Sequence, residues 1–271
     1  MLPLARHSAI LKAVTARGSC SVAELASELE VSGETIRRDI KQMAREGLVR
    51  RVHGGVGLPD LLRESSFRQR LAEHAEAKQT IARLAAAQVR NGDSLMMDTG
   101  STTAYVAHAL SGHRNLLLVT NCTEIARLLA NGNGNQVLLA GGELRADDGA
   151  VFGAEAVRFV NGFRSRLAIL SIGAIHTSDG FMDFHLQEAE FSRALIAQAN
   201  QVVVVADHSK FGRHAPVKVC GFRDVNSLIT DQPPPKAIAR HLAEAKVKVM
   251  IAAGDAPRNG DPGSPLGQSG G

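Results

Sequence analysis

The sequence contains little cysteine, and its histidines are scattered. The three cysteines, Cys20, Cys122 and Cys220, lie far apart and form no Cys-x-x-Cys pair. This spacing predicts neither a zinc site nor a disulfide framework, and it indicates a reducing, cytoplasmic environment. The ten histidines include no His-x-x-x-His pair that would place two imidazoles on one helical face. We therefore predict no metal site.

Long apolar runs and the common nucleotide-binding motifs are also missing. Nowhere do 18 uninterrupted apolar residues occur, and the N-terminus lacks a long apolar core. Neither a membrane span nor a secretion signal is therefore expected. The chain has no Gly-Lys-Ser/Thr sequence of a P-loop and no Gly-x-Gly-x-x-Gly sequence of a Rossmann fold. ATP and NAD are thus poor candidates for ligands, and no cofactor is predicted.

Length and charge suit a two-domain protein with one basic end. The chain has 271 residues, of which 44% are hydrophobic, and a net charge of +4. Residues 1–55 contain nine Lys/Arg and six Asp/Glu, so most of the excess positive charge lies there. That position is the one expected of a DNA-binding module. Because a single copy with this small excess would bind phosphate weakly, we expect two or more copies to act together.

The segment 32–55 is typical of a DNA-reading helix followed by a basic wing. Ser32 can cap the start of a helix, and Glu34 suits the positive end of the helix dipole. The hydrophobic residues Ile36, Ile40 and Met43 recur at helical spacing and predict a buried stripe. Arg38 and Lys41 fall roughly opposite that stripe, with Arg37 on its flank, where guanidinium groups can reach guanine edges or phosphates. The predicted DNA-binding residues are Ser32, Thr35, Arg37, Arg38, Lys41, Arg50, Arg51 and His53.

The preceding residues complete a helix-turn-helix. Ile10, Leu11 and Val14 predict a first helix, and a second is expected over 22–29 with Ser21 as its cap. The third helix is predicted to end at Gly47, followed by a short strand over 48–53 and a turn at Gly54-Gly55. The alternative is a three-helix module with a solvated basic face. Cap, stripe, turn and wing occur together in the order that DNA reading requires, which favours the first interpretation.

The rest of the chain predicts an α/β domain. A linker is expected over 58–75, the domain over 76–252 and a disordered tail, rich in Gly, Pro and Ser, over 253–271. Apolar strands alternate with helices, which favours a mostly parallel sheet covered on both faces. Strands are predicted at 94–97, 116–120, 136–140, 167–172, 202–206, 227–230 and 246–251. Helices are predicted at 76–89, 123–130, 188–199 and 236–245.

Small and polar residues follow several of these strands, where ligands bind in such sheets. The sequence Asp98-Thr-Gly-Ser-Thr-Thr103 combines a glycine that allows close approach, three hydroxyl groups and a helix start that can meet an anion. Lys210 offers a compact positive charge for a phosphate oxygen. Each residue alone also fits an ordinary strand-end turn or cap, but together they favour a shared site. The predicted effector-binding residues are Asp98, Gly100, Ser101, Thr102, Thr103, Asn121, Gly141, Gly173, Asp207 and Lys210.

The motifs also resemble those of a known family. Val31-Ser32, Thr35-Ile-Arg-Arg-Asp39 and His53-Gly-Gly55 resemble the N-terminal domain of DeoR/GlpR-type bacterial transcriptional regulators. That resemblance implies a winged helix-turn-helix domain followed by a sensor domain with a ribose-5-phosphate isomerase-like fold. In the family, Asp-x-Gly-[Ser/Thr]-Thr binds phosphate, and Asp-x-Ser-Lys-Phe corresponds to 207–211 here. Members are generally repressors that a phosphorylated sugar or polyol, such as glycerol-3-phosphate, releases from DNA.

One loop departs from the glycerol-3-phosphate subgroup, because the sequence of residues 182–188 is unusual for that subgroup.

The family resemblance implies three partners: operator DNA, a phosphorylated effector and further copies of the chain in a dimer or tetramer. It implies no membrane partner. The rival hypothesis is a sugar-phosphate isomerase-like enzyme, because Asp183, His185, Glu188 and Glu190 could shuttle protons. Acids at the start of a helix also suit its dipole. A sensor domain attached to a DNA-binding domain needs only to bind its ligand and need not convert it. We therefore predict that the protein is not an enzyme.

Overall fold

The computed structural model describes residues 3–45, 48–52, 54–57 and 64–252. The predicted tail at 253–271 lies outside these ranges, as do 58–63 of the predicted linker. Within the described ranges, no helix combines the length and apolar character that crossing a membrane needs.

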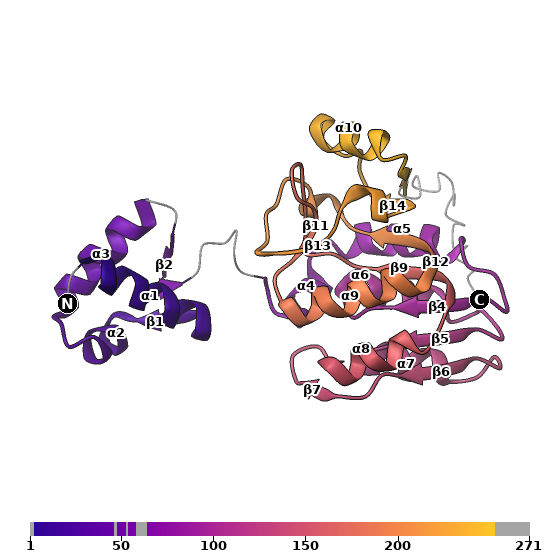
Figure 1. Ribbon diagram of the computed structural model, residues 1–271, viewed down its shortest axis with the longest axis horizontal. Helices are drawn as coiled ribbons and strands as arrows, with labels where there is room; N and C mark the ends of the chain where they lie inside the picture. Colours follow the sequence, from indigo (N-terminus) through magenta and orange to yellow (C-terminus); the bar gives the residue numbers. More distant parts are fainter. Residues whose placement is uncertain (1–2, 46–47, 53, 58–63, 253–271) are drawn as a thin grey trace, which may run out of the picture.

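The N-terminal domain is three helices closed by a small antiparallel sheet (Figure 1). Its sheet has the order β1-β3-β2, and its core contains Ile10, Leu25, Ile36 and Met43, each fully buried. The three predicted helices and the first wing strand are confirmed, whereas the predicted helix end at Gly47 lies outside the described residues. The elements are α1 Pro3–Arg17, β1 Ser19–Ser21, α2 Val22–Glu28, α3 Gly33–Arg45, β2 Arg50–Val52 and β3 Gly55–Gly57.

The strand β1 was not predicted, because its three residues pair with β3, more than 30 positions further along the chain. This pairing explains Gly55. A Cβ atom at that position would lie 2.2 Å from the carbonyl oxygen of Cys20, so only glycine lets the two strands approach.

The larger domain is built on a seven-stranded parallel sheet of order β15-β14-β12-β9-β4-β5-β6. These seven strands correspond to the seven predicted ones, and the α/β fold class is confirmed. They are β4 Ser94–Met97, β5 Leu117–Thr120, β6 Gln136–Leu139, β9 Ser165–Leu170, β12 Ala199–Val205, β14 Ser227–Thr230 and β15 Lys248–Ile251.

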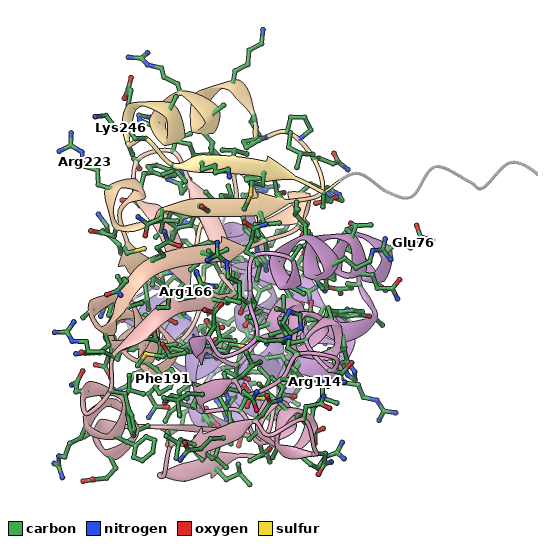
Figure 2. The ribbon with its side chains drawn as sticks, turned by 90° about the vertical axis from the view of Figure 1, so that its right-hand side faces the viewer. Glu76, Arg114, Arg166, Phe191, Arg223 and Lys246 are labelled. Carbon is green, nitrogen blue, oxygen red and sulfur yellow. The ribbon has the colours of Figure 1, made fainter. Side chains whose placement is uncertain are left out.

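Helices cover both faces of this sheet, because its central strands are apolar on both sides. Leu95 and Met97 of β4 point to one core, while Met96 between them points to the other. The first core is covered by α5 Ala75–Ala86, α6 Ser101–Ala109 and α7 Thr123–Ala130. The second is covered by α8 Ala154–Asn161, α9 Leu186–Gln198 and α10 Lys236–Glu244. Phe191 of α9 is buried there, whereas Arg223 and Lys246 are exposed (Figure 2).

Two antiparallel additions were not predicted. The hairpin β7 Glu143–Arg145 and β8 Ala150–Phe152 lies beside the carboxyl ends of the sheet strands, where Val151 N donates to the carbonyl of Asn121 at 2.9 Å. The second addition is a three-stranded sheet of β10 Ala174–His176, β11 Gly180–Asp183 and β13 Val217–Cys220. Strands this short give little periodicity to read.

The region predicted to be a linker contains structure. The helix α4 Phe67–Ala72 lies within it, with Phe67 only 7% exposed, and Tyr105 Oη donates to the carbonyl of Leu71 at 3.0 Å. Six residues are too few to form a helix alone, so contacts with α6 account for α4. The remaining short elements, the 3₁₀ turns η2 His208–Lys210 and η3 Phe222–Asp224, follow β12 and β13.

Candidate functional site

The helix α3 presents a basic face opposite its buried stripe. Arg37, Arg38 and Lys41 are exposed, whereas Ile36 and Met43 are fully buried. Arg37 Nη1 lies 3.4 Å from Glu34, an exposed pair of little energetic weight. The geometry leaves both guanidinium groups available to a groove or a phosphate.

The start of α3 is organised by Ser32. Its Oγ accepts a hydrogen bond from Thr35 N at 3.1 Å, and the two hydroxyl oxygens are 2.9 Å apart. Ser32 thus has a structural role as a cap whatever else it contacts. Thr35 is half-buried.

The wing carries the remaining predicted DNA contacts. Arg51 on β2 is exposed, and Arg50 is partly buried. His53 lies outside the described residues, so its predicted role has no structural counterpart here.

The acid that follows the two arginines turns inward, which the sequence interpretation missed. Asp39 is 5% exposed, and its Oδ1 accepts from Arg6 Nη2 at 3.0 Å and lies 3.2 Å from His7 Nε2. The hydrogen bond from Arg6 lowers the pKa of the Asp39 carboxyl below its ordinary value. This ion pair fixes α3 against α1, so it sets the direction in which Arg37 and Arg38 point.

In the larger domain, a small cavity lies at the carboxyl ends of the central strands. Five of the predicted effector residues line it: Gly100, Ser101, Thr102, Gly173 and Lys210. The cavity volume is about 20 Å³, room for roughly one water molecule. The other lining residues are Glu64, Arg70, Thr99, Ser171, Ile172, Asp183 and Glu188.

One wall of this cavity is the start of α6. Gly100 is its N-cap, and no side chain of the described residues caps the helix, so these residues offer no side-chain acceptor to its first-turn N–H groups. A Cβ atom on Gly100 would lie 1.8 Å from Ser171 Oγ, which explains the glycine. An uncapped helix start of this kind attracts an anion through its N–H groups and its dipole.

Lys210 supplies a positive charge to the wall of the same cavity. It is 9% exposed, and burial lowers the pKa of its ammonium group, while the charges of Glu64 and Asp207 oppose that shift. Asp207 does not line the cavity; its Oδ1 accepts from Ser209 N at 3.0 Å and caps η2.

Three other predicted residues stand behind the cavity wall. Asp98 accepts from Ser171 N at 3.0 Å, and burial raises the pKa of its carboxyl well above the ordinary value. Thr103 Oγ1 donates to the carbonyl of Gly100 at 3.1 Å, and Asn121 Oδ1 accepts from Thr99 N at 3.0 Å. All three hold the loop after β4 in shape, whereas Gly141 is exposed and away from the cavity.

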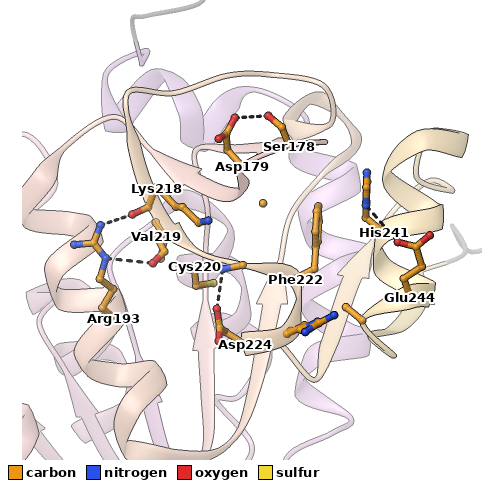
Figure 3. Close-up of a pocket in the computed structure, with 14 residues that line it drawn as sticks. Ser178, Asp179, Arg193, Lys218, Val219, Cys220, Phe222, Asp224, His241 and Glu244 are labelled. Carbon is orange, nitrogen blue, oxygen red and sulfur yellow. Dashed lines mark hydrogen bonds and ion pairs between the residues drawn. The ribbon is translucent and has the colours of Figure 1, made fainter.

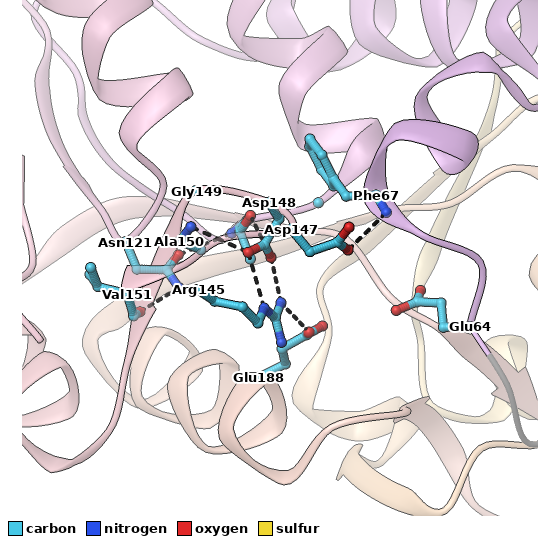
Figure 4. A network of polar contacts seen from close by, with 12 residues as sticks. Glu64, Phe67, Asn121, Arg145, Asp147, Asp148, Gly149, Ala150, Val151 and Glu188 are labelled. Atoms are coloured by element: carbon cyan, nitrogen blue, oxygen red, sulfur yellow. Dashed lines mark hydrogen bonds and ion pairs between the residues drawn. The ribbon is translucent and has the colours of Figure 1, made fainter. Parts of the chain in front are cut away.

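A wider cleft adjoins the cavity and shares Arg70 and Glu188 with it. Its volume is about 420 Å³, within the range of small-molecule sites. Arg145 crosses it, with its Nε 3.0 Å from Asp148 Oδ1 and its Nη2 2.5 Å from Glu188 Oε1 (Figure 4). The guanidinium also lies 4.4 Å over the Phe152 ring. A polyol would meet both donors and acceptors here.

The acids around the cavity are held in a low-dielectric environment. Burial, followed by the negative charge of Glu188, raises the pKa of Asp183 well above its ordinary value. Burial also raises the pKa of Glu188, although Arg145 opposes that shift. Groups of this kind bind a proton more readily when an anion approaches.

The sequence interpretation missed Arg70 and Arg145 as site residues. Arg70 falls in the segment predicted as a linker, and Arg145 belongs to the unpredicted β7 strand. The Gly-Gly-Glu-Leu-Arg sequence that follows β6 was the available signal, and it pointed to Gly141 rather than to Arg145.

Possible metal ligands also meet in space among the described residues. The two groups are His74 with Asp207 and His208, and Glu64 with His185 and Glu188, with ligand atoms within 4.8 Å of one another. Their members come from distant segments, so spacing in the sequence could not reveal them. The absence of a metal site therefore stays a prediction.

A separate groove of about 740 Å³ lies between β11, β13 and α10 (Figure 3). Phe222 and His241 stack there with ring centroids 5.7 Å apart, and Lys218 lines the same groove. Burial raises the pKa of the Cys220 thiol to about 12, so it is no nucleophile near neutral pH. None of the predicted effector residues is among the residues that line this groove.

Comparison with known proteins decides the family. A model of the DeoR-like helix-turn-helix domain matches residues 6–61, and a model of the DeoR C terminal sensor domain matches residues 73–232. The chain belongs to the DeoR family of transcriptional regulators. This confirms the resemblance that the sequence motifs indicated, and it assigns the α3 face to a DNA-binding domain.

Relatives of this DeoR-family protein match over nearly its whole length. The glycerol-3-phosphate regulon repressor of Escherichia coli (strain K12) is 37% identical, over 91% of this chain and 98% of the relative. The repressor of the same name from Haemophilus influenzae is 38% identical, over 92% and 97%. The HTH-type transcriptional repressor CsqR of E. coli is 33% identical, over 93% and 96%.

Among solved structures, ribose 5 phosphate isomerase A from Neisseria gonorrhoeae is 17% identical, with a TM-score of 0.36. The match covers 49% of this chain and 52% of that chain. A likeness this distant carries no inference about function.

Proposed function

We propose that this protein is a repressor that leaves its operator DNA when a phosphorylated polyol or sugar occupies the strand-end cavity. The observation that carries the proposal is the meeting of the uncapped α6 start with Lys210 in one enclosed space. Helix N–H groups and a buried ammonium group are the donors that a phosphate accepts from.

Glycerol-3-phosphate is the effector that we favour. The inner cavity presents the donors that a phosphate accepts from, and the adjoining cleft offers Arg145, Asp147 and Glu188 to hydroxyl groups. Two of the relatives are named for the glycerol-3-phosphate regulon, which supports the same ligand class.

On DNA, we assign base reading to Thr35, Arg37 and Arg38, and phosphate contacts to Lys41, Arg50, Arg51 and His53. The small positive excess of one copy favours a dimer or tetramer that places two α3 helices on one operator. Since its partner is chromosomal DNA, we place the protein in the cytoplasm.

A binding screen followed by a release assay tests this function. Operator DNA would first be selected from a random duplex library with the full-length protein. Fluorescence anisotropy would then follow release of labelled operator as sn-glycerol-3-phosphate, other sugar phosphates or the unphosphorylated compounds are added. We expect release by a phosphorylated compound and none by glycerol. Release by glycerol at equal concentration would contradict the phosphate site.

A second candidate function is sugar-phosphate isomerisation, because Asp183 and Glu188 carry raised pKa values beside the cavity. We favour binding alone, since a regulator needs no turnover. Incubating the pure protein with ribose-5-phosphate and measuring product decides between them. Turnover that disappears in Glu188→Gln would establish the enzyme.

A further inference from the structure

The first described segment after the DNA-binding domain reaches into the anion cavity. Residues 64–72, which we call the strap, include α4 and place both Glu64 and Arg70 in the cavity wall. Glu64 therefore lines the sensor cavity although it follows β3 of the DNA-binding domain, which ends at Gly57, by only a few residues in the sequence.

The strap is held more firmly at its far end than at its start. At the far end, Tyr105 Oη donates to the carbonyl of Leu71 at 3.0 Å, and Lys78 Nζ donates to the carbonyl of Arg70. Nearer its start, Phe67 N donates to Asp147 Oδ2 at 3.0 Å. Displacing Glu64 therefore moves the start of the strap and loosens the first turn of α4, while the last turn of α4 stays anchored.

Glu64 is buried in the cavity with incomplete hydrogen bonding. Its side chain is 9% exposed, and its Oε2 lies 2.9 Å from Arg70 Nη1. That contact lacks hydrogen-bond geometry, and Oε2 has no hydrogen-bond partner among the described residues, because Arg70 Nη1 donates to the carbonyl of Ser65 at 2.6 Å instead. A buried carboxylate oxygen that accepts no hydrogen bond raises the free energy of the protein. Moving Glu64 out of the cavity therefore costs little.

The same carboxylate faces the cation that we assign to the effector. Glu64 and Lys210 line the same small cavity, and the negative charge of Glu64 opposes the lowering of the Lys210 pKa by burial. The remaining space of about 20 Å³ cannot hold a phosphate while Glu64 is in place. Effector and Glu64 thus need the same cations and the same volume.

We propose that Glu64 is a built-in competitor of the effector: its carboxylate holds the anion position in the empty cavity, and the effector's phosphate displaces it. This inference rests on the proposed function. A phosphate monoester brings a charge of about −1.5 to −2 and three acceptor oxygens, so it satisfies Lys210, Arg70 and the α6 N–H groups better than one carboxylate does. Expulsion of Glu64 moves the start of the strap, and the movement passes along the chain toward the DNA-binding domain.

The substitution Glu64→Gln tests this by removing the charge while keeping the shape. Isothermal titration of the full-length protein with sn-glycerol-3-phosphate and with inorganic phosphate is expected to show affinity at least about tenfold tighter in the variant, a typical size for coupling between sites. Glu76→Gln is the matched control, because Glu76 is exposed at the start of α5 and does not line the cavity. Its affinity should equal that of the unsubstituted protein.

Trypsin cleavage after Arg68 gives a second readout that follows the strap itself. In the unsubstituted protein, sn-glycerol-3-phosphate is expected to speed cleavage there, and Glu64→Gln should be cleaved fast without it. Equal or weaker phosphate affinity in Glu64→Gln, with unchanged cleavage, would overturn the inference while leaving the proposed function intact. If the unsubstituted protein binds no phosphorylated compound at all, the proposed function fails instead.

Discussion

The two functional regions of this protein are built in opposite ways. The DNA-reading face takes its arginines and lysine from one helix, and they are exposed and paired weakly or not at all with the acids of α3. The effector cavity gathers its residues from the strap, three strand ends, β11 and α9, and its charges are buried. Exposed charges bind strongly only when a partner arrives, whereas buried charges already interact within the protein. DNA binding and effector binding thus depend on different residues, and substitutions can test the two regions one at a time.

The largest expected effect comes from Lys210→Ala. Removing a buried cation from a phosphate should cost about 2–5 kcal/mol of effector binding, because the anion loses its charged partner inside the protein. Operator affinity should be unchanged in anisotropy titrations, while release by sn-glycerol-3-phosphate disappears. Lys236→Ala, an exposed lysine at the start of α10, is the control. A Lys210→Ala protein that is still released normally would show that the cavity is misassigned.

The substitution Arg38→Ala should have the opposite pattern and weaken only the binding of operator DNA. Losing one bidentate base contact costs about 1–3 kcal/mol, so operator affinity should fall by roughly 5- to 150-fold. Effector affinity measured by titration without DNA should not change. Arg114→Ala removes an exposed arginine from the larger domain and should leave operator binding as it was. Equal losses in the two variants would mean that net charge, not the α3 face, drives binding.

A smaller effect is expected on the stability of the N-terminal domain in Asp39→Asn. The loss of a buried hydrogen-bonded ion pair should lower the free energy of unfolding by about 1–3 kcal/mol at pH 7. Because the folded-state pKa of Asp39 is lowered, its contribution is present above the unfolded pKa of about 3.9 and is lost as the pH falls through the folded value. Urea unfolding at several pH values should show the two proteins converging below about pH 4. A difference that stays constant down to pH 3 would speak against this ion pair.

The smallest effect is proton uptake when the effector binds. Burial lowers the pKa of Lys210 and raises those of Asp98, Asp183 and Glu188, and a phosphate dianion favours the protonated form of each. Effector affinity should therefore rise as the pH falls below about 10, the ordinary pKa of a lysine. Titration calorimetry in two buffers of different ionisation enthalpy measures the uptake as a fraction of a proton. Net proton release would show that the bound effector does not favour the protonated forms of these groups.

The accuracy of the sequence predictions differs between the regions for a physical reason. A helical face has a period that neighbouring residues reveal, so the outward positions of Arg37, Arg38 and Lys41 follow from the stripe of Ile36, Ile40 and Met43. The seven strands of the sheet also have local apolar signals. The cavity is different, because Glu64 and Arg70 lie in a segment of low periodicity and Arg145 lies in a three-residue strand.

The roles of individual residues were harder to predict than their neighbourhoods. Asp98, Thr103 and Asn121 belong to the predicted loops but support the cavity from behind. A carboxylate or amide after a strand can face a ligand or hold the next loop, and both uses need the same residue type. Only the partner atoms, such as Ser171 N for Asp98, decide between them.

Local patterns of caps, apolar stripes and apolar strands were enough to predict the winged helix-turn-helix, the parallel sheet and the family, because neighbouring residues reveal each of them. The inward turn of Asp39 to Arg6 and the entry of Glu64 into the cavity of Lys210 follow from the packing of the folded chain. Such pairings join residues that are tens to more than a hundred positions apart, and they depend on the volume and charge that remain once the sheet and its helices have packed.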